Sequence, residues 1–224
     1  MRIPFLFLLA VLFLLSAPIT LAQTSDYLIV TWRAENLYPA DFAGRAMPTP
    51  GSPVQVSAET ILGGKLTNSG LAEISWFLDG ALLEKGVGTK TVRFTARGNT
   101  ANSHFLRVQV KVAGKNLEES VRVPVKQVKV AMEIPAINKV LPSNSELQLS
   151  AVPYFFNASS LENLVFNWII NNTRQKETGN GSLTLNIGQP QSSTQQKMTI
   201  IANVQNLLNP LEVAQERGIF SISQ

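Results

Sequence analysis

The sequence repeats itself at an offset of about 92 residues, and this duplication constrains the fold more than any other feature. Residues 76–80 (WFLDG) match 168–172 (WIINN), and residues 54–58 (VQVSA) match 147–151 (LQLSA). Further matches follow in the same order: 92–94 with 183–185, 108–112 with 200–204, and 116–118 with 210–212. Self-similarity at one offset is the signature of a repeated structural unit. We therefore expect two domains, at 23–126 and 127–224, joined by almost no linker.

Each repeat reads as a series of short strands. Apolar and polar residues alternate over many short runs, which places one set of side chains on a buried face and the other in solvent. Turn residues between such runs are typical of a sandwich or barrel. The expected strands are 27–32, 54–58, 91–95, 106–112, 121–125, 128–134, 147–150, 182–187 and 198–204. Helix signals are nearly absent; the best candidate is 207–216, and Pro210 weakens it.

A tryptophan motif lies at the centre of each repeat. Trp76 precedes Asp79-Gly80, Trp168 precedes Asn171-Asn172, and a later glycine opens the next strand. A buried tryptophan fills the space between two sheets, and Asp, Asn and Gly tolerate the left-handed backbone of a tight hairpin turn. We expect both tryptophans to be structural core residues.

This arrangement resembles PKD-like and related bacterial immunoglobulin-like modules. The resemblance covers nearly all of the chain after the first 22 residues and implies an all-β fold of two tandem immunoglobulin-like (PKD-like) antiparallel β-sandwiches. Domain two departs from the motif by carrying Asn172 where the first repeat has glycine. Modules of this class commonly mediate protein–protein or protein–carbohydrate contacts, so the resemblance implies binding.

The first 22 residues have the order of a signal peptide. Arg2 supplies a positive charge, residues 5–15 are apolar, and residues 20–22 (TLA) place small residues before Gln23. This pattern predicts cleavage by a signal peptidase and export to the periplasm, the cell surface or the medium. The alternative is an uncleaved anchor, because residues 3–23 are long enough to span a bilayer. We expect no other contact with the membrane.

The absence of cysteine excludes disulfides, cysteine-ligated metals and cysteine nucleophiles. It also argues against an antibody-type domain and favours a bacterial origin. The formal net charge of +4 falls by one to +3 when Arg2 leaves with the leader. This mild basic balance is spread along the chain without a concentrated patch or stacking aromatics, so no nucleic-acid partner is expected.

No catalytic, cofactor-binding or metal-binding residue is expected. His104 is the single histidine, and it cannot form a triad or metal site without partners from elsewhere in the chain. Asp79 has two interpretations, a calcium ligand or a turn aspartate, and turn chemistry accounts for it fully. None of the common hydrolase, zinc-protease, phosphate-loop or dinucleotide motifs is present.

An insertion rich in proline distinguishes the first repeat. Residues 39–53 contain Pro39, Pro48, Pro50 and Pro53, and the corresponding stretch of the second repeat is shorter. Inserted loops often carry binding functions, so we expect Tyr38, Phe42 and Met47 to contact a partner. The alternative is that Phe42 and Met47 cover the open end of the core.

These features predict a non-enzymatic exported binding or structural module of a bacterial cell-surface or extracellular assembly. Its partner would be a protein or a surface polymer of the cell envelope. The alternative is an accessory substrate-binding subunit of an exported enzyme that degrades polysaccharide or protein. That alternative would need a planar strip of exposed aromatics, for which residues 154–156 (YFF) are the candidate; their other interpretation is packing in the core and hinge.

Overall fold

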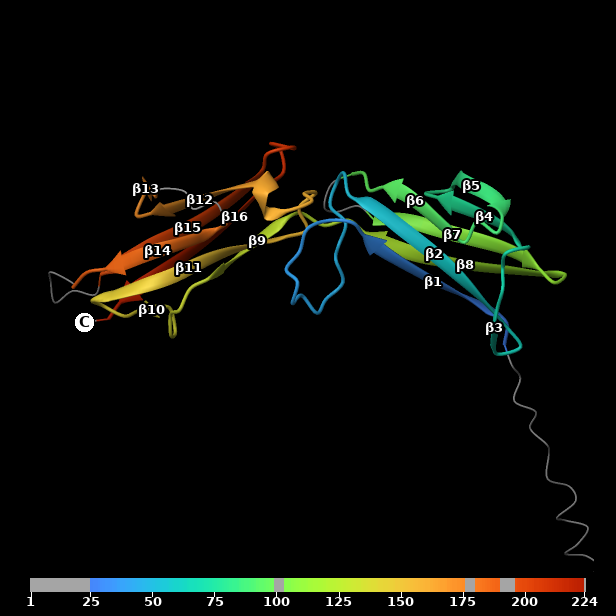
Figure 1. The fold of residues 1–224 in the computed structure, drawn as a ribbon, viewed down its shortest axis with the longest axis horizontal. Coiled ribbons are helices and arrows are strands. Elements are labelled where there is room, and N and C mark those ends of the chain that lie inside the picture. The colour runs from blue at the N-terminus through green and yellow to red at the C-terminus, as the bar shows by residue number, and fades with distance from the viewer. Residues whose placement is uncertain (1–24, 99–102, 176–179, 190–195, 224) are drawn as a thin grey trace, which may run out of the picture.

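A computed structural model describes residues 25–98, 103–175, 180–189 and 196–223. The leader predicted at residues 1–22 lies outside them. The described chain forms two β-sandwiches that follow one another along a bent, elongated molecule (Figure 1). In this part of the chain, no helix is long and apolar enough to cross a membrane.

The first sandwich pairs two four-stranded sheets. In one sheet β2 pairs with β1, β3 and β6, and the other has the order β5-β4-β7-β8. The strands are β1 (Tyr27–Ala34), β2 (Pro53–Leu62), β3 (Lys65–Thr67), β4 (Glu73–Leu78), β5 (Ala81–Val87), β6 (Thr91–Thr95), β7 (Ser103–Val112) and β8 (Lys115–Pro124).

The second sandwich repeats this plan with one three-stranded sheet and one five-stranded sheet. One has the order β14-β11-β9 and the other β10-β16-β15-β12-β13. The elements are β9 (Lys129–Glu133), β10 (Val140–Leu141), β11 (Ser145–Tyr154), the 3₁₀ helix η1 (Leu161–Asn163), β12 (Leu164–Ile170), β13 (Thr173–Arg174), β14 (Ser182–Ile187), β15 (Lys197–Asn206) and β16 (Val213–Ile222).

Both units are immunoglobulin-like sandwiches. Their matched strands occupy the same places: β1, β2 and β6 correspond to β9, β11 and β14, and β4, β5, β7 and β8 correspond to β12, β13, β15 and β16. This division of early and middle strands between two sheets is the immunoglobulin-like arrangement. The all-β prediction from alternation and from the repeat is confirmed.

Two features depart from the expectations. The candidate helix at 207–216 is wrong, because residues 207–212 form turns and bends, and Val213–Ile222 is β16, paired antiparallel with β15 from Val213 to Ser221. The backbone pairing of a long neighbouring strand outweighs the weak local helix preference of this segment. The sandwiches are also not purely antiparallel, because β10 pairs in parallel with β16.

A tryptophan lies in the core of each sandwich. Trp76 is 0% exposed and Trp168 is 1% exposed, and they belong to two separate clusters of buried residues. The indole N–H of Trp76 donates to the carbonyl of Thr89 at 2.8 Å, and that of Trp168 donates to the carbonyl of Gly181 at 3.3 Å. Each indole therefore buries its ring and satisfies its single donor.

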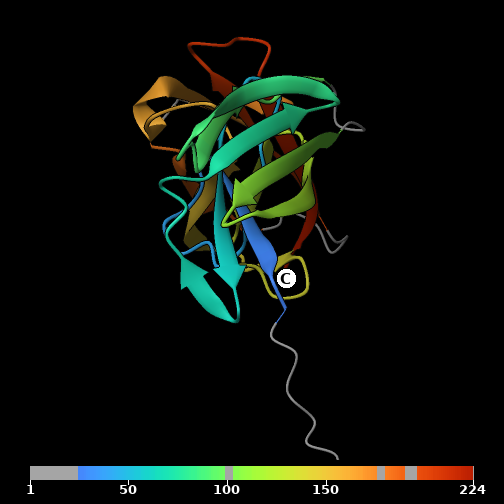
Figure 2. The ribbon, with the colours of Figure 1, turned by 90° about the vertical axis from the view of Figure 1, so that its right-hand side faces the viewer.

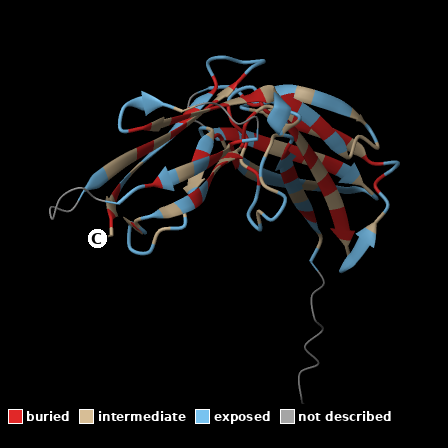
Figure 3. Ribbon diagram, turned by 60° about the vertical axis from the view of Figure 1, so that its left-hand side comes forward, coloured by how far each residue is buried: buried red, intermediate tan, exposed pale blue. Residues whose placement is uncertain are grey.

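Alternating buried and exposed positions along the strands are visible in Figure 3.

The hairpin turn after each tryptophan has the same geometry. Asp79 and Gly80 have φ of 52° and 87°, and Asn171 and Asn172 have φ of 48° and 69°. Two consecutive left-handed residues make the tight turn whose twist matches the flanking strands. The first turn residue also reaches the next strand: Asp79 Oδ1 accepts from the Phe105 amide at 2.8 Å, and Asn171 Oδ1 accepts from the Thr199 amide at 2.9 Å.

Candidate functional site at the domain junction

The segment between β1 and β2, which contains the insertion, leaves the first sandwich and pairs with the second. After β1 the chain crosses to the second sandwich, where the Leu37 amide donates to the Phe156 carbonyl at 2.7 Å and the Phe155 amide donates to the Leu37 carbonyl at 2.6 Å. It then returns through residues 39–53 to begin β2. In Figure 1 this segment hangs between the two sandwiches. The junction is therefore built from three stretches: the insertion, the short connection after β8, and the loops of the second sandwich.

Aromatic rings fill part of this junction. The ring of Phe42 packs edge-on against Tyr154 and Phe155, with centroids 5.6 Å away in both cases, and lies 6.0 Å from Tyr38. Phe42 and Met47 are half-buried and pack against a small cluster that includes Phe155. Of the three residues expected to contact a partner, Tyr38 is the exposed one, at 43%. Phe42 and Met47 are engaged within the chain.

The aromatic run 154–156 belongs to the junction. Phe156 is 0% exposed and Phe155 is 9% exposed. Phe156 joins the core of the second sandwich, while Phe155 belongs to the cluster beneath the insertion. These two rings therefore pack in the core and hinge, as one of the two interpretations predicted, and do not form an exposed strip.

Polar side chains tie the insertion to the second sandwich. The Asn36 side-chain amide donates to the Met47 carbonyl at 2.8 Å and to the Phe155 carbonyl at 3.2 Å. The Thr49 hydroxyl donates to the same Phe155 carbonyl at 3.0 Å. The Ser52 hydroxyl donates to Asn157 Oδ1 at 2.6 Å. These hydrogen bonds rigidify the junction, because breaking any one of them leaves a costly unpaired group.

Glu212 is the buried acid of the junction, and it was not predicted from the sequence. It is 7% exposed and comes from the end of the β15–β16 connection. Its carboxylate accepts from the backbone amide of Asn157 at 3.1 Å and from the side-chain amides of Asn157 and Asn206 at 2.8 and 2.6 Å. A longer, bifurcated bond of 3.4 Å joins it to the Thr49 hydroxyl of the first domain, whose single proton is shared with the Phe155 carbonyl. Charge-assisted bonds of this kind are stronger than neutral ones.

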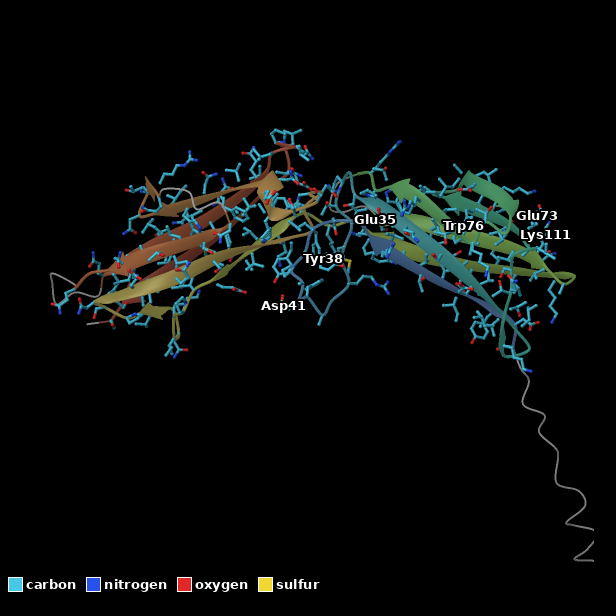
Figure 4. All side chains as sticks on the ribbon, in the orientation of Figure 1. Glu35, Tyr38, Asp41, Glu73, Trp76 and Lys111 are labelled. Atoms are coloured by element: carbon cyan, nitrogen blue, oxygen red, sulfur yellow. The ribbon has the colours of Figure 1, made fainter. Side chains whose placement is uncertain are left out.

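Open grooves flank the exposed Tyr38. One has a volume of about 530 Å³ and is lined by Arg33, Ala34, Glu35, Asn36, Leu37, Tyr38, Ala158 and Ser159. A second, of about 370 Å³, lies between the start of the insertion and the second sandwich, and Tyr38 lines it as well. Figure 4 shows Tyr38 and Asp41 on the segment between the two domains, far from Glu73 and Lys111 at the outer end of the first sandwich. Tyr38 thus lines both grooves.

No family model matches the chain, and no curated protein matches it. Among solved structures, the three N-terminal domains of the bacteriophage RB49 Highly Immunogenic Outer Capsid protein are similar, with 12% identity, a TM-score of 0.46, and coverage of 88% of this chain and 59% of that chain. Fibronectin(III)-like modules of Clostridium thermocellum CbhA give 11% identity and a TM-score of 0.32, covering 87% of this chain and 93% of theirs.

The full ectodomain of mouse nectin-like molecule 4 gives 15% identity and a TM-score of 0.34, covering 87% of this chain and 63% of that chain. These similarities are too low to carry a conclusion about ligand or partner. The immunoglobulin-like assignment rests on the strand order of the two sandwiches.

His104 and Asp79 form a pair that sequence reasoning missed. His104 Nδ1 lies 2.7 Å from Asp79 Oδ2, and His104 Nε2 accepts from the Arg97 amide at 2.9 Å. Since Nε2 accepts, the proton is assigned to Nδ1, which donates to the carboxylate. Partial burial alone would raise the pKa of Asp79, but hydrogen bonds from the Phe105 amide and from His104 lower that pKa below its usual value.

His104 and Asp79 are the residue types of a catalytic dyad, but their contacts differ from those of one. A general base needs a free nitrogen within reach of a substrate proton, and here a backbone amide occupies Nε2. The pair instead ties the turn after β4 to the start of β7, and the Arg97 amide adds the segment after β6 to the same contact. No signal in the sequence indicates it, because the two residues are brought together only by strand pairing. Among the described residues, no group of three or more His, Asp or Glu side chains is placed to hold a metal ion.

Proposed function

We propose that this chain is a non-enzymatic, exported binding or structural module of a bacterial cell-surface or extracellular assembly, and that its partner binds at the domain junction. The observation that carries the proposal is the insertion 39–53, which fastens the two sandwiches together while leaving Tyr38 exposed between two grooves. A fixed junction loses little conformational entropy when a partner binds across it.

Export is part of the proposal and rests on the leader. The order of charge, apolar run and small residues in 1–22 is that of a signal peptide. The boundary between domains at 126 and 127 is also proposed. It is supported by the two clusters of buried residues, which end at Val125 on one side and begin at Val130 on the other. The partner would be a protein or a surface polymer of the envelope.

Binding is favoured over catalysis by the state of the titratable groups in the described chain. The histidine is held at both ring nitrogens. The buried carboxylate of Glu212 is engaged by donors from three residues. Groups fixed in this way serve structure, because a catalytic acid or base must exchange its proton with a substrate.

Photo-cross-linking in the exporting cell tests the proposal. A photoreactive phenylalanine analogue replaces Tyr38 in one variant and Tyr27 in a matched control, because these tyrosines are 43% and 46% exposed. Tyr27 is the first residue of β1, whereas Tyr38 lies beyond the other end of that strand, at the junction. We expect a discrete adduct from position 38 and not from position 27, identified by mass spectrometry. The proposal fails if position 38 gives no adduct or the same adducts as position 27.

A stability measurement separates the two roles predicted for the insertion. Tyr38→Ala removes an exposed ring and should leave the melting temperature nearly unchanged while abolishing partner binding. Phe42→Ala removes a ring that packs on Tyr154 and Phe155 and should lower the melting temperature. Partner binding that survives Tyr38→Ala contradicts a contact role for that ring.

A further inference from the structure

The connection between β15 and β16 exposes a group of leucines. Leu207, Leu208 and Leu211 are 56%, 72% and 95% exposed. We call residues 207–211 the Leu tip. The corresponding hairpin of the first domain, between β7 and β8, is only a two-residue turn at 113–114. The tip is therefore an addition to the second sandwich. Apolar residues exposed singly are normal on a protein surface, but a cluster of exposed leucines indicates an interaction site.

The Leu tip is held in one conformation. The Leu207 amide donates to the Asn163 carbonyl at 2.8 Å, and the Leu208 amide donates to Asn206 Oδ1 at 2.9 Å. The Glu212 amide closes the loop onto the Asn209 carbonyl at 2.8 Å. The side chain of Gln205 donates to the Pro210 carbonyl, also at 2.8 Å. The leucines are thus presented by an ordered backbone and are not exposed through loop disorder.

These internal hydrogen bonds also lower the cost of moving the Leu tip from water into apolar surroundings. A backbone group that leaves water without a partner costs free energy, and this cost keeps irregular loops out of apolar surroundings. The bonds to Asn163, Asn206 and Asn209 reduce that cost for the tip. Its side chains carry no charge, so desolvation of the tip removes water mainly from apolar surface.

The position of the tip suits a flat surface. The molecule is bent, and the tip projects from the convex side near the junction, whereas the insertion hangs on the concave side (Figure 1). Viewed along the long axis, the tip and the beginning of β1 lie on opposite sides (Figure 2). A plane can therefore touch the tip without meeting either sandwich first.

The chemistry of the tip selects among flat surfaces. Three leucine side chains fall far short of the 20–30 residues a side that a standard protein interface uses, so a second copy docked through the tips alone is disfavoured. Residues 207–211 contain no charged side chain that could bind a charged wall polymer. A bilayer needs no shape complementarity and accepts any protruding apolar group. We propose that the Leu tip inserts into the interfacial region of a lipid bilayer and docks the molecule there, independently of the leader and of the partner at the grooves.

Vesicle flotation with the leader-free chain 23–224 tests this docking, since every described strand lies within that range. The probes are vesicles of phosphatidylcholine alone and of phosphatidylcholine with phosphatidylglycerol. The test variant is Leu208→Ser combined with Leu211→Ser. The matched control is Leu71→Ser, because Leu71 is 94% exposed but lies in the first domain, between β3 and β4.

We expect the double variant to bind both kinds of vesicle at least ten-fold more weakly, since burial of each leucine contributes separately. The control should bind like the wild type, and binding should change little with salt because the tip is uncharged. All variants should share one melting temperature. The proposal is overturned if the wild type does not float with vesicles or if Leu71→Ser weakens binding equally. It is also overturned if the double substitution leaves vesicle binding unchanged and only separates a dimer of the chain into monomers. Cross-linking at position 38 is a separate readout, so either idea can fail alone.

Discussion

Removing the carboxylate of Glu212 should destabilise the second sandwich and loosen its junction with the first. The substitution Glu212→Ala deletes an acceptor that is 7% exposed and receives hydrogen bonds from Asn157, Asn206 and Thr49. Two of these donors are almost completely buried, with Asn206 0% and Thr49 1% exposed. Water cannot reach them easily in place of the carboxylate.

The size of the effect follows from the number of bonds lost. Hydrogen bonds to a charged group contribute about 1.5–3 kcal/mol each, and the two closest, from Asn157 and Asn206, are lost outright. Thr49 keeps its second partner, the carbonyl of Phe155, so its share is smaller. We expect the free energy of unfolding to fall by about 3 kcal/mol or more. Glu212→Gln retains one accepting oxygen and should cost about half as much.

Calorimetry and urea unfolding measure this loss. A fall of about 3 kcal/mol corresponds to a drop of at least about 10 °C in the melting temperature of a domain of this size. The control is Glu216→Ala, the same substitution four residues along in β16 at an exposed position. If Glu212→Ala has the same melting temperature as Glu216→Ala, the carboxylate does not hold the junction and the reasoning is refuted.

Three further predictions concern the two sandwiches. Trp76→Ala and Trp168→Ala should each unfold their own domain, because truncating a buried tryptophan costs about 3–5 kcal/mol; wild-type melting of either would contradict the core assignment. The separate fragments 23–126 and 127–224 should each give β-type circular dichroism; an unfolded half with a folded full chain would indicate one interdependent unit. Because the folded-state pKa of Asp79 is lowered, its stabilising contribution is present above its unfolded pKa and is lost as the pH falls through the folded value. Asp79→Asn keeps the oxygen that accepts from the β7 amide, so it should fold and lose less stability than the wild type below about pH 4; identical acid unfolding curves would argue against this.

The local part of the structure is predictable from the sequence because it depends on near neighbours. Alternation reports which face of a strand is buried, and the Asp79-Gly80 and Asn171-Asn172 pairs predict a left-handed turn from residue type alone. The helix expected at 207–216 is wrong for the opposite reason. Its strand state depends on pairing with β15, which a window of ten residues cannot report.

The candidate site illustrates the limit more sharply. Sequence reasoning singled out the insertion and Tyr38, Phe42 and Met47, but it could not say which of them would remain exposed. Phe42 is half-buried because Tyr154 and Phe155 arrive from the other domain, more than a hundred positions later. The buried role of Glu212 was equally invisible, since glutamate is a residue type that is mostly exposed and nothing in the neighbouring sequence marks it as buried.

The sequence by itself therefore determined the repeat, the all-β character and the two tryptophan-centred units, because period, turn chemistry and burial preference act over a few residues. Only the tertiary structure decided the junction, the pairing of His104 with Asp79 and the exposure of the Leu tip. Each of these depends on which distant segments the closed sandwiches bring within hydrogen-bonding or van der Waals range, and such long-range contacts leave no local pattern in the chain.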